Sequence, residues 1–598
     1  MQTPNLTRRA LSAAIASSFL AGRATWAANT TAPGAPASTV AAIAEEYYHG
    51  NFALFPLEAT ENLGDARYEA AFEIDISPDH RRRERELHEQ ILARLRTVDV
   101  AKLTSDERLT YDLLSWDARD RLAQLDFPHH LMPVNHMDPT PVRLAQWAGG
   151  QGSQPLKTTA NYEHFLARLK RLPEWMDQAI VNMREGIARR IVLPRAIVER
   201  TLPQLDALLP ADTSASPFLA GTREFPATVP QADRQRLRDA YAATVRDSLV
   251  PAVTRLRDFM RNQYLPAARA SAGFGALPGG ADAYQVAVRS STTTDMTPEE
   301  IHALGLREVA RIRGEMEKVK SRFGFTGTLD AFFKSLDDRP ELTPFTTDEE
   351  VLAAFRAINE RVKAGLPKLF ERMPKAPLEI RAVEPMRRDT ASSYYVPPAL
   401  DGSRPGVFFA AFGSAATVHT PSMTPLFLHE GQPGHHFQMA LQREIATSDY
   451  RRNAWYNAHG EGWALYAEGL GRELGLYEDP KPWLGRLQLE MLRAIRLVVD
   501  SGMHAKGWSR EKAIAYSREN DGSSEDEARR AIERYMVWPG QALAYKVGEL
   551  KILQLRERAR TKLGARFDIR AFHTQVLDSG CVPLKLLEAK VDGWLAAS

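Results

Sequence analysis

The chain has 598 residues, of which 44% are hydrophobic and 25% charged, the composition of a globular protein with a sizeable core. Its 77 basic and 75 acidic residues leave a formal charge of +2, so charge gives no reason to expect nucleic acid or an anionic membrane as a partner. Cys581 is the only cysteine, which excludes an internal disulfide and a cysteine-ligated metal site and leaves His, Asp and Glu as metal ligands.

The N-terminus predicts an export signal. Arg8 and Arg9 precede a weakly apolar run at residues 10–22, which is too short and alanine-rich for a spanning helix. The paired arginines resemble the twin-arginine signal of bacterial proteins that are exported already folded. We therefore expect a signal over residues 1–28, a flexible lead-in over residues 29–44, and a periplasmic mature protein without a membrane span.

Helical patterns dominate the rest of the chain. Apolar residues recur at spacings of three and four, and capping boxes begin at Thr104 and Ser524. Thr297 is an expected N-cap, followed by a first-turn proline and two acids. We expect a mainly α fold in which residues 45–598 form a single domain.

A break in this pattern predicts where the domain divides. Residues 270–295 are rich in Gly, Ala, Ser and Thr and include Pro278-Gly279-Gly280. This composition predicts a long loop between an N-terminal half, residues 45–269, and a catalytic half, residues 296–598.

Two short stretches predict strands. Leu378–Val383 and Val407–Phe409 flank a turn-rich segment at residues 397–406. They would form a small β-sheet that leads into the histidine-rich motif that follows.

Residues 424–438, TPLFLHEGQPGHHFQ, hold three histidines and a glutamate within eight positions. Thr424 as N-cap and Pro425 in the first turn predict a helix that starts about one turn before His429. Zinc accepts neutral imidazole and carboxylate ligands, and zinc peptidases keep their general base directly after the first histidine, where Glu430 stands.

The spacing of the histidines requires a deformed helix. The plain zinc-peptidase motif has its second histidine four residues after the first, but that position is Pro433. On a regular helix His436 would lie about 10.5 Å beyond His429, too far for one ion. Pro433 and Gly434 predict a kink or bulge, and a two-residue bulge would place His435 one turn from His429.

A third ligand is expected from the next helix. The segment at residues 457–468, NAHGEGWALYAE, carries Glu461 and Glu468 seven residues apart on one helix face. Glu461 is the preferred ligand, and Glu468 would orient a histidine or lie on the helix surface. In the alternative interpretation, His435 and His436 are core histidines and no metal binds.

At these two motifs the chain resembles the bacterial domain of unknown function family 885. The family patterns H-E-x-x-P-G-H-H-x-Q and E-G-W-A-x-Y-x-E are matched in full, and the resemblance runs from about residue 45 to the end. It implies a large helical, zincin-like fold of the gluzincin type, similar in layout to the carboxypeptidase Taq family.

The resemblance also implies a metal site. It gives His429, His435 and Glu461 as ligands of one Zn²⁺ ion and Glu430 as the base that activates the water. In the carboxypeptidase Taq family the glutamate follows the second histidine at about the interval that separates His435 from Glu461, which favours His435 over His436.

Other polar residues are candidates for catalysis and substrate binding. His436, His504, Tyr535 and Tyr545 could donate a hydrogen bond to the oxyanion. Arg496, Asp500 and His504 line one helix face, where Asp500 could fix the His504 tautomer. Arg534 or Lys546 could hold a peptide carboxylate, as in a carboxypeptidase, or form an ion pair between helices.

Together these features predict an exported zinc-dependent peptidase that hydrolyses short peptides through a metal-activated water. One alternative is a zinc-dependent hydrolase of another amide or ester, such as a cell-wall peptide or a small molecule. Another is a non-catalytic metal- or peptide-binding protein of the envelope. The sequence leaves the substrate, the direction of cleavage and the oligomeric state open.

Overall fold

The computed structural model describes residues 39–62, 64–150, 152–337, 339–384, 392–400 and 402–598. The predicted export signal lies outside these residues, as does the lead-in up to residue 38. The last part of the predicted lead-in is helical instead, because α2 begins at Thr39. Val40, Ile43 and Ala44 are buried, so apolar spacing already directs this segment into a core.

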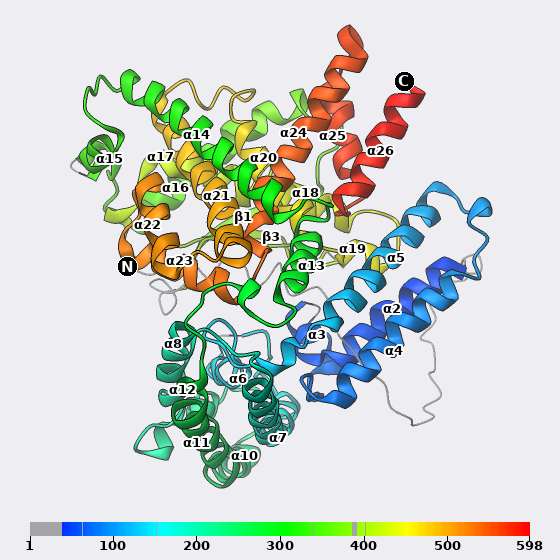
Figure 1. Ribbon diagram of the computed structural model, residues 1–598, viewed down its shortest axis with the longest axis vertical. Helices are drawn as coiled ribbons and strands as arrows, with labels where there is room; N and C mark the ends of the chain where they lie inside the picture. The colour runs from blue at the N-terminus through cyan, green and yellow to red at the C-terminus, as the bar shows by residue number, and fades with distance from the viewer. Residues whose placement is uncertain (1–38, 63, 151, 338, 385–391, 401) are drawn as a thin grey trace. The chain divides into compact units, whose positions relative to one another are not determined.

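The described chain divides into two compact units. The first comprises residues 39–272 and 276–283, and the second comprises residues 273–275 and 284–598. The helices of the first unit are α2 Thr39–Leu54, α3 Pro56–Asn62, α4 Pro78–Leu95, α5 Ser105–Asp126, α6 Thr140–Ala148, α7 Thr159–Arg189, α8 Arg195–Asp206, α9 Ala220–Arg223, α10 Gln231–Thr244, α11 Val250–Phe259 and α12 Leu265–Ala267 (Figure 1).

The second unit contains the histidine motif. Its helices are α13 Gly280–Thr292 (from Tyr284 onward), α14 Pro298–Arg322, α15 Leu329–Asp337, α16 Asp348–Gly365, α17 Thr420–Glu430, α18 His435–Arg443, α19 Asp449–Asn453, α20 Asn457–Gly469, α21 Pro480–Lys506, α22 Arg510–Asp521, α23 Glu525–Val537, α24 Ala544–Leu563, α25 Ile569–Leu577 and α26 Leu584–Ala597. The mainly α prediction is confirmed. The two predicted capping boxes form at the starts of α5 and α23, and the predicted N-cap Thr297 forms a further one at the start of α14.

The predicted loop at residues 270–295 is wrong in its centre. Helix α13 begins at Gly280, directly after Gly279, whose φ of +70° suits glycine. Tyr284 and Val288 are buried one helical turn apart, so this Gly- and Ala-rich segment has an apolar stripe sufficient to dock a helix. The break between the two units nevertheless falls within the predicted range.

A small β-sheet precedes the motif, as predicted, and it has three strands. Strand β1, Leu378–Ala382, pairs in parallel with β3, Gly406–Ala410, with Leu378 opposite Gly406. The sequence did not predict the third strand, β2 Tyr394–Val396, which pairs antiparallel with the other edge of β3.

Close helix packing in the second unit holds the site. Helix α21 packs against both α17 and α14, and α20 packs along α24 (Figure 1). Gly462 of α20 and Gly548 of α24 allow the latter pair to approach closely, because a Cβ atom added at Gly462 would lie 2.5 Å from the Gly548 Cα. This contact brings the start of α24 beside the middle of α20.

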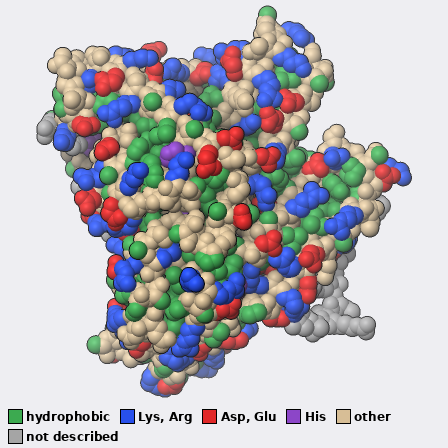
Figure 2. Space-filling view, in the orientation of Figure 1, with side chains coloured by type: hydrophobic (Ala, Val, Ile, Leu, Met, Phe, Trp, Pro, Cys, Tyr) green, Lys and Arg blue, Asp and Glu red, His purple; other side chains and the backbone are tan. Residues whose placement is uncertain are grey.

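The visible face of the molecule carries basic and acidic side chains side by side (Figure 2). This mixture agrees with the small formal charge of +2. Within the described residues, no helix is both long enough and apolar enough to cross a membrane.

Candidate metal centre

Helix α17 delivers His429 and Glu430 at its C-terminal end. The predicted start at Thr424 is wrong, because the helix begins one turn earlier at Thr420, with His419 as N-cap and Pro421 in the first turn. Pro425 therefore lies inside the helix, where it removes one backbone hydrogen bond. The packing of α17 against α21 supports the additional turn.

The helix breaks where the sequence predicted a deformation. Helix α17 ends at Glu430 and α18 begins at His435, so the intervening residues form a turn rather than a bulge within one helix. A Cβ atom at Gly434 would lie 2.0 Å from the His429 carbonyl oxygen, so only glycine allows this approach. The Trp463 indole N–H donates to the Pro433 carbonyl at 2.8 Å and fixes the turn from α20.

This turn brings His429 and His435 beside Glu461 of α20. Glu461 Oε2 lies 3.6 Å from His429 Nε2 and 3.5 Å from His435 Nε2. One ligand atom from each of the three residues lies within 4.8 Å of the other two, and all three side chains are buried. These residues could together hold one metal ion.

Glu468, two helical turns beyond Glu461 on α20, orients His429. The His429 Nδ1–H donates to Glu468 Oε1 at 2.8 Å, and in the neutral ring this bond leaves the Nε2 lone pair for a ligand. Glu468 is itself fully buried and lies 3.4 Å from Arg486 Nε of α21. The predicted role of Glu468 as a histidine acceptor matches this geometry.

The charges at the cluster shift the pKa values of its members. Burial disfavours a charged His429, yet the hydrogen bonds with Glu461 and Glu468 raise its pKa to about 9. Burial alone would raise the pKa of Glu461, but hydrogen bonds with His429 and His435 hold it well below its usual value. The cluster therefore stabilises positive charge between its carboxylates.

Glu430 lies beside the cluster without joining it. It is 3% exposed, and burial raises its pKa, an effect that the nearby His435 and His429 partly offset. No hydrogen bond or ion pair engages its carboxylate within the described part of the chain. A buried acid with a raised pKa and no fixed partner is suited to proton transfer.

His436 lies outside the cluster. Its Nδ1 pairs with the Tyr395 hydroxyl of β2 at 3.0 Å, and the ring also bonds the backbone of Ala376. Burial lowers the pKa of His436 to about 4, so it stays neutral. The choice of His435 over His436 as a cluster member agrees with this placement. The predicted oxyanion role of His436 does not fit, because both ring nitrogens are engaged.

Asp500 and His504 do not form the predicted pair. His504 Nδ1 accepts from the Phe274 amide at 3.0 Å, and its Nε2–H donates to the Tyr535 carbonyl at 3.0 Å. Asp500 accepts from the Tyr284 hydroxyl at 2.6 Å and from the Gly540 amide. Both residues are thus held in the core that joins α21 to its neighbours, and we do not assign His504 to the reaction.

Lys546 does not fit the predicted binding of a peptide carboxylate. It is fully buried, and its Nζ lies 2.5 Å from Glu490, 2.6 Å from Glu549 and 3.1 Å from Glu308. The alternative that the sequence offered, an ion pair between helices, describes this arrangement. Three carboxylates already satisfy the ammonium group.

Arg496, Arg534, Tyr535 and Tyr545 gather near the cluster with a residue that the sequence analysis missed, Arg493. Arg496 donates to the Tyr535 hydroxyl at 3.1 Å, and its guanidinium carbon lies 4.7 Å from the centre of the Tyr545 ring. Arg493 precedes Arg496 by three residues on α21, a spacing that could have identified it. Burial and the nearby Glu461 raise the pKa of Tyr545 to about 12, so its hydroxyl stays protonated and could donate to an oxyanion.

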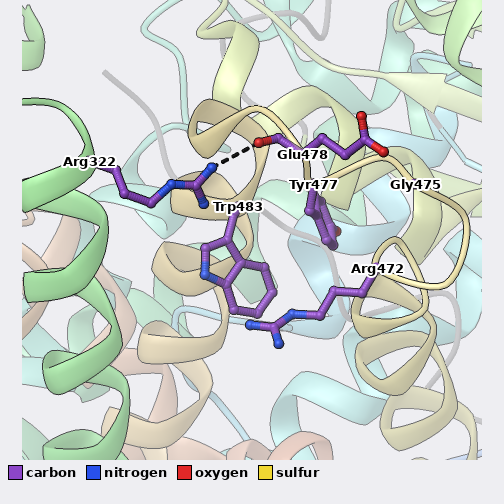
Figure 3. A pocket seen from close by; sticks show the side chains of 6 residues that line it. All are labelled: Arg322, Arg472, Gly475, Tyr477, Glu478 and Trp483. Atoms are coloured by element: carbon purple, nitrogen blue, oxygen red, sulfur yellow. Dashed lines mark hydrogen bonds between the residues drawn. The ribbon is translucent and has the colours of Figure 1, made fainter.

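A separate cavity of about 370 Å³ lies elsewhere in this unit, lined by Arg322, Arg472, Gly475, Tyr477, Glu478 and Trp483 (Figure 3). The Arg472 guanidinium carbon lies 3.9 Å from the centre of the Trp483 ring, and Arg322 donates to the Glu478 carbonyl at 2.8 Å. None of the cluster residues lines this cavity.

The fold and site define a mainly helical protein with a buried His-His-Glu cluster and an adjacent acid. The chain belongs to the family described as bacterial proteins of unknown function (DUF885), whose sequence profile matches residues 56–591. A search of curated proteins finds no match.

Two solved structures share the fold. The crystal structure of "the putative lipoprotein from Colwellia psychrerythraea" has a TM-score of 0.83 and 29% identity, covering 94% of this chain and 100% of that chain. The structure of "a putative lipoprotein of unknown function from Shewanella oneidensis" has a TM-score of 0.75 and 19% identity, covering 92% of this chain and 99% of that chain. The second likeness shows the fold alone.

Proposed function

We propose that the protein is an exported zinc-dependent peptidase with a zincin-like catalytic unit. The observation that carries this proposal is the convergence of His429, His435 and Glu461 within 4.8 Å, with Glu430 directly after the first histidine. Two imidazoles and one carboxylate form the ligand set of a catalytic zinc site that keeps a position open for water or substrate.

The donors present fit a divalent cation. Two Nε2 atoms face one carboxylate, and the Glu468 carboxylate fixes the tautomer of His429 from behind. Three buried glutamates, Glu430, Glu461 and Glu468, surround the two histidines. A divalent ion would compensate this concentration of buried negative charge.

The roles of the side chains follow from their positions. Zinc, when bound, lowers the pKa of water and polarises the scissile carbonyl. Glu430, which directly follows His429 and whose pKa is raised by burial, would accept a proton from the attacking water and deliver it to the leaving amine. Glu468 would hold the His429 ring in place, and the protonated Tyr545 would donate to the developing oxyanion.

Export is part of the proposal. The twin-arginine-like N-terminus supports it, and the similar protein from Colwellia psychrerythraea is described as a "putative lipoprotein". We propose a periplasmic location, where the enzyme would act on short peptides.

The test combines catalysis with metal analysis. A diverse peptide library is incubated with the zinc-loaded wild-type protein and with Glu430→Gln, and mass spectrometry identifies the products. Inductively coupled plasma emission spectroscopy measures the zinc bound to each protein. We expect cleavage by the wild type only, with zinc retained in Glu430→Gln. Loss of zinc is expected in His429→Ala, His435→Ala and Glu461→Ala but not in His436→Ala.

Several results would refute the assignment. Undiminished hydrolysis by Glu430→Gln would remove the proposed base, and loss of zinc in His436→Ala alone would reverse the ligand choice. Zinc binding without cleavage of any peptide would redirect the proposal to another amide or ester substrate.

A further inference from the structure

Three buried arginines next to the cluster have no carboxylate partner. Arg493, Arg496 and Arg534 are each 8% exposed, and no ion pair links any of them to a carboxylate in the part of the chain that the structure describes. Buried charges are otherwise almost always paired, since an isolated buried ion costs several kcal/mol. Glu468 and Glu461 act on Arg493 only beyond ion-pair distance, so the three guanidinium groups remain able to pair directly with an added anion.

Neutral groups bind these arginines only in part. Arg493 donates to the Leu489 carbonyl at 3.1 Å, Arg496 to the Tyr535 hydroxyl, and Arg534 to Gln541 and Tyr545. At least one buried N–H group on each guanidinium, Arg493 Nε, Arg496 Nη1 and Arg534 Nε, has no acceptor. Each unsatisfied donor adds to the cost of burial.

The arginines converge on one aromatic side chain. The Arg496 and Arg493 guanidinium carbons lie 4.7 and 5.9 Å from the centre of the Tyr545 ring, and Arg534 reaches the same tyrosine by a hydrogen bond. Two residues come from α21, one from α23 and one from α24. We call Arg493, Arg496, Arg534 and Tyr545 the arginine site.

The arginine site adjoins the proposed metal centre. Arg493 lies within electrostatic reach of both Glu430 and Glu461, and Arg496 and Tyr545 lie within reach of Glu461. An anionic group bound by the arginines would therefore carry the neighbouring part of its molecule toward His429 and His435.

We propose that the arginine site binds the free C-terminal carboxylate of a peptide, so that the enzyme removes residues from the C-terminus. This inference rests on the proposed peptidase function and names its substrate class. Guanidinium groups match carboxylates in a planar, bidentate geometry, and the terminal carboxylate is the one anion that every unmodified peptide carries. Burial strengthens the pairing and excludes water from it.

Binding can be measured without turnover. Short peptides with uncharged side chains and an N-terminal fluorophore, made as free acids and as C-terminal amides, are titrated into zinc-loaded Glu430→Gln protein by fluorescence anisotropy. We expect the free acid to bind on the order of 100-fold more tightly than the amide. Equal affinities would overturn the proposal, and this comparison requires no change to the arginines.

Arginine variants test whether these residues cause the preference for the free acid over the amide. Arg496→Gln and Arg534→Gln, each made in the Glu430→Gln background, should bring the acid-to-amide ratio toward 1, and Arg496→Lys should keep part of it. Arg518→Gln, on the exposed side of α22, serves as the matched control and should keep the full ratio. A preference that survives both Gln substitutions would place the carboxylate elsewhere and overturn the assignment.

Turnover separates this inference from the proposed function. Wild-type protein that cleaves acids and amides equally would preserve the peptidase and refute the carboxylate site. Wild-type protein that cleaves neither, combined with an arginine-dependent preference in the binding assay, would preserve the carboxylate site and refute the peptidase. Release of single C-terminal residues from the acids alone is the result expected if both hold.

Discussion

Two groups of basic side chains share helix α21 and differ in what neutralises them. The first group, which we call the ion-pair network, contains Arg311, Arg486 and Lys546 with four glutamates: Glu308, Glu468, Glu490 and Glu549. The second is the arginine site, whose three guanidinium groups donate hydrogen bonds to tyrosines, an amide and a carbonyl and form no ion pair among the described residues. Buried arginines on α21, Arg486 and Arg496, therefore stand in two different environments.

The difference indicates which group is complete. The ion-pair network has three formal positive and four negative charges, and its glutamate nearest to the metal centre, Glu468, also accepts the hydrogen bond from His429. It can join four helices and orient a ligand without any further group. The arginine site has three guanidinium groups without an ion-pair partner among the described residues. Glu468 and Glu461 act on Arg493 only from beyond ion-pair distance, so a bound anion could pair directly with the site.

The largest effect on stability should come from breaking the ion-pair network. Lys546→Met leaves Glu308, Glu490 and Glu549 without their shared cation, and we expect the free energy of unfolding to fall by about 3–5 kcal/mol. Denaturant unfolding followed by circular dichroism measures this loss.

Lys551→Met provides the matched control on the same helix. Lys551 pairs with Glu588 at 3.1 Å, and its side chain is 21% exposed, so its loss should cost less than about 1 kcal/mol. Equal losses in the two variants would contradict the contrast between buried and partly exposed pairs.

Asp500 is a buried acid on α21, and its contribution to stability should depend on pH. Burial raises its pKa from 3.8 to about 7, while hydrogen bonds from Tyr284 and Gly540 offset part of this effect. The folded state favours the protonated form of Asp500. Its contribution to the free energy of unfolding is therefore complete below about pH 4 and is lost as the pH rises through about 7. This shift corresponds to roughly 4 kcal/mol.

Asp500→Asn removes this titration and keeps the shape of the side chain. The stability of the variant relative to the wild type should therefore increase between pH 4 and pH 8, by up to about 4 kcal/mol. Chemical unfolding of both proteins across this range gives the difference. Parallel stability curves would show that Asp500 does not change its protonation on unfolding.

Glu468 links the ion-pair network to the metal centre, and its loss should weaken metal binding. Glu468→Gln cannot take the charged hydrogen bond from His429 or balance Arg486, so we expect the affinity for zinc to fall about 10–100-fold. Competition with a chromogenic chelator measures the affinity. Glu473→Gln, which disrupts a more exposed pair with Arg556, should leave it unchanged.

Short-range signals in the sequence predicted much of this architecture. The capping boxes at Thr104 and Ser524 and the N-cap at Thr297 form as expected, because the partners in each lie within three residues. The placement of His435 beside His429 followed from Pro433 and Gly434, whose backbone preferences act locally. The roles of these residues in binding a metal remain predictions.

Features that depend on tertiary packing could not be predicted. His419 caps α17 without a side-chain hydrogen bond, so no local signal distinguished this start from the one at Thr424. Lys546 and Arg496 are both basic residues on helices, and only the surrounding carboxylates, from residues far away in sequence, decide that the former is paired and the latter is not.

The smallest expected change in the free energy of unfolding gives the most specific test of the contrast between the ion-pair network and the arginine site. Arg496→Met removes a buried charge that has no carboxylate partner, so the desolvation cost that it relieves offsets the lost contacts with Tyr535 and Tyr545. We expect the free energy of unfolding to change by less than about 1 kcal/mol in either direction, in contrast to Lys546→Met. The same unfolding assay applies to both variants. A loss of about 3–5 kcal/mol for Arg496→Met would mean that the folded protein already pairs this arginine, which would remove the reason to expect an anion at the arginine site.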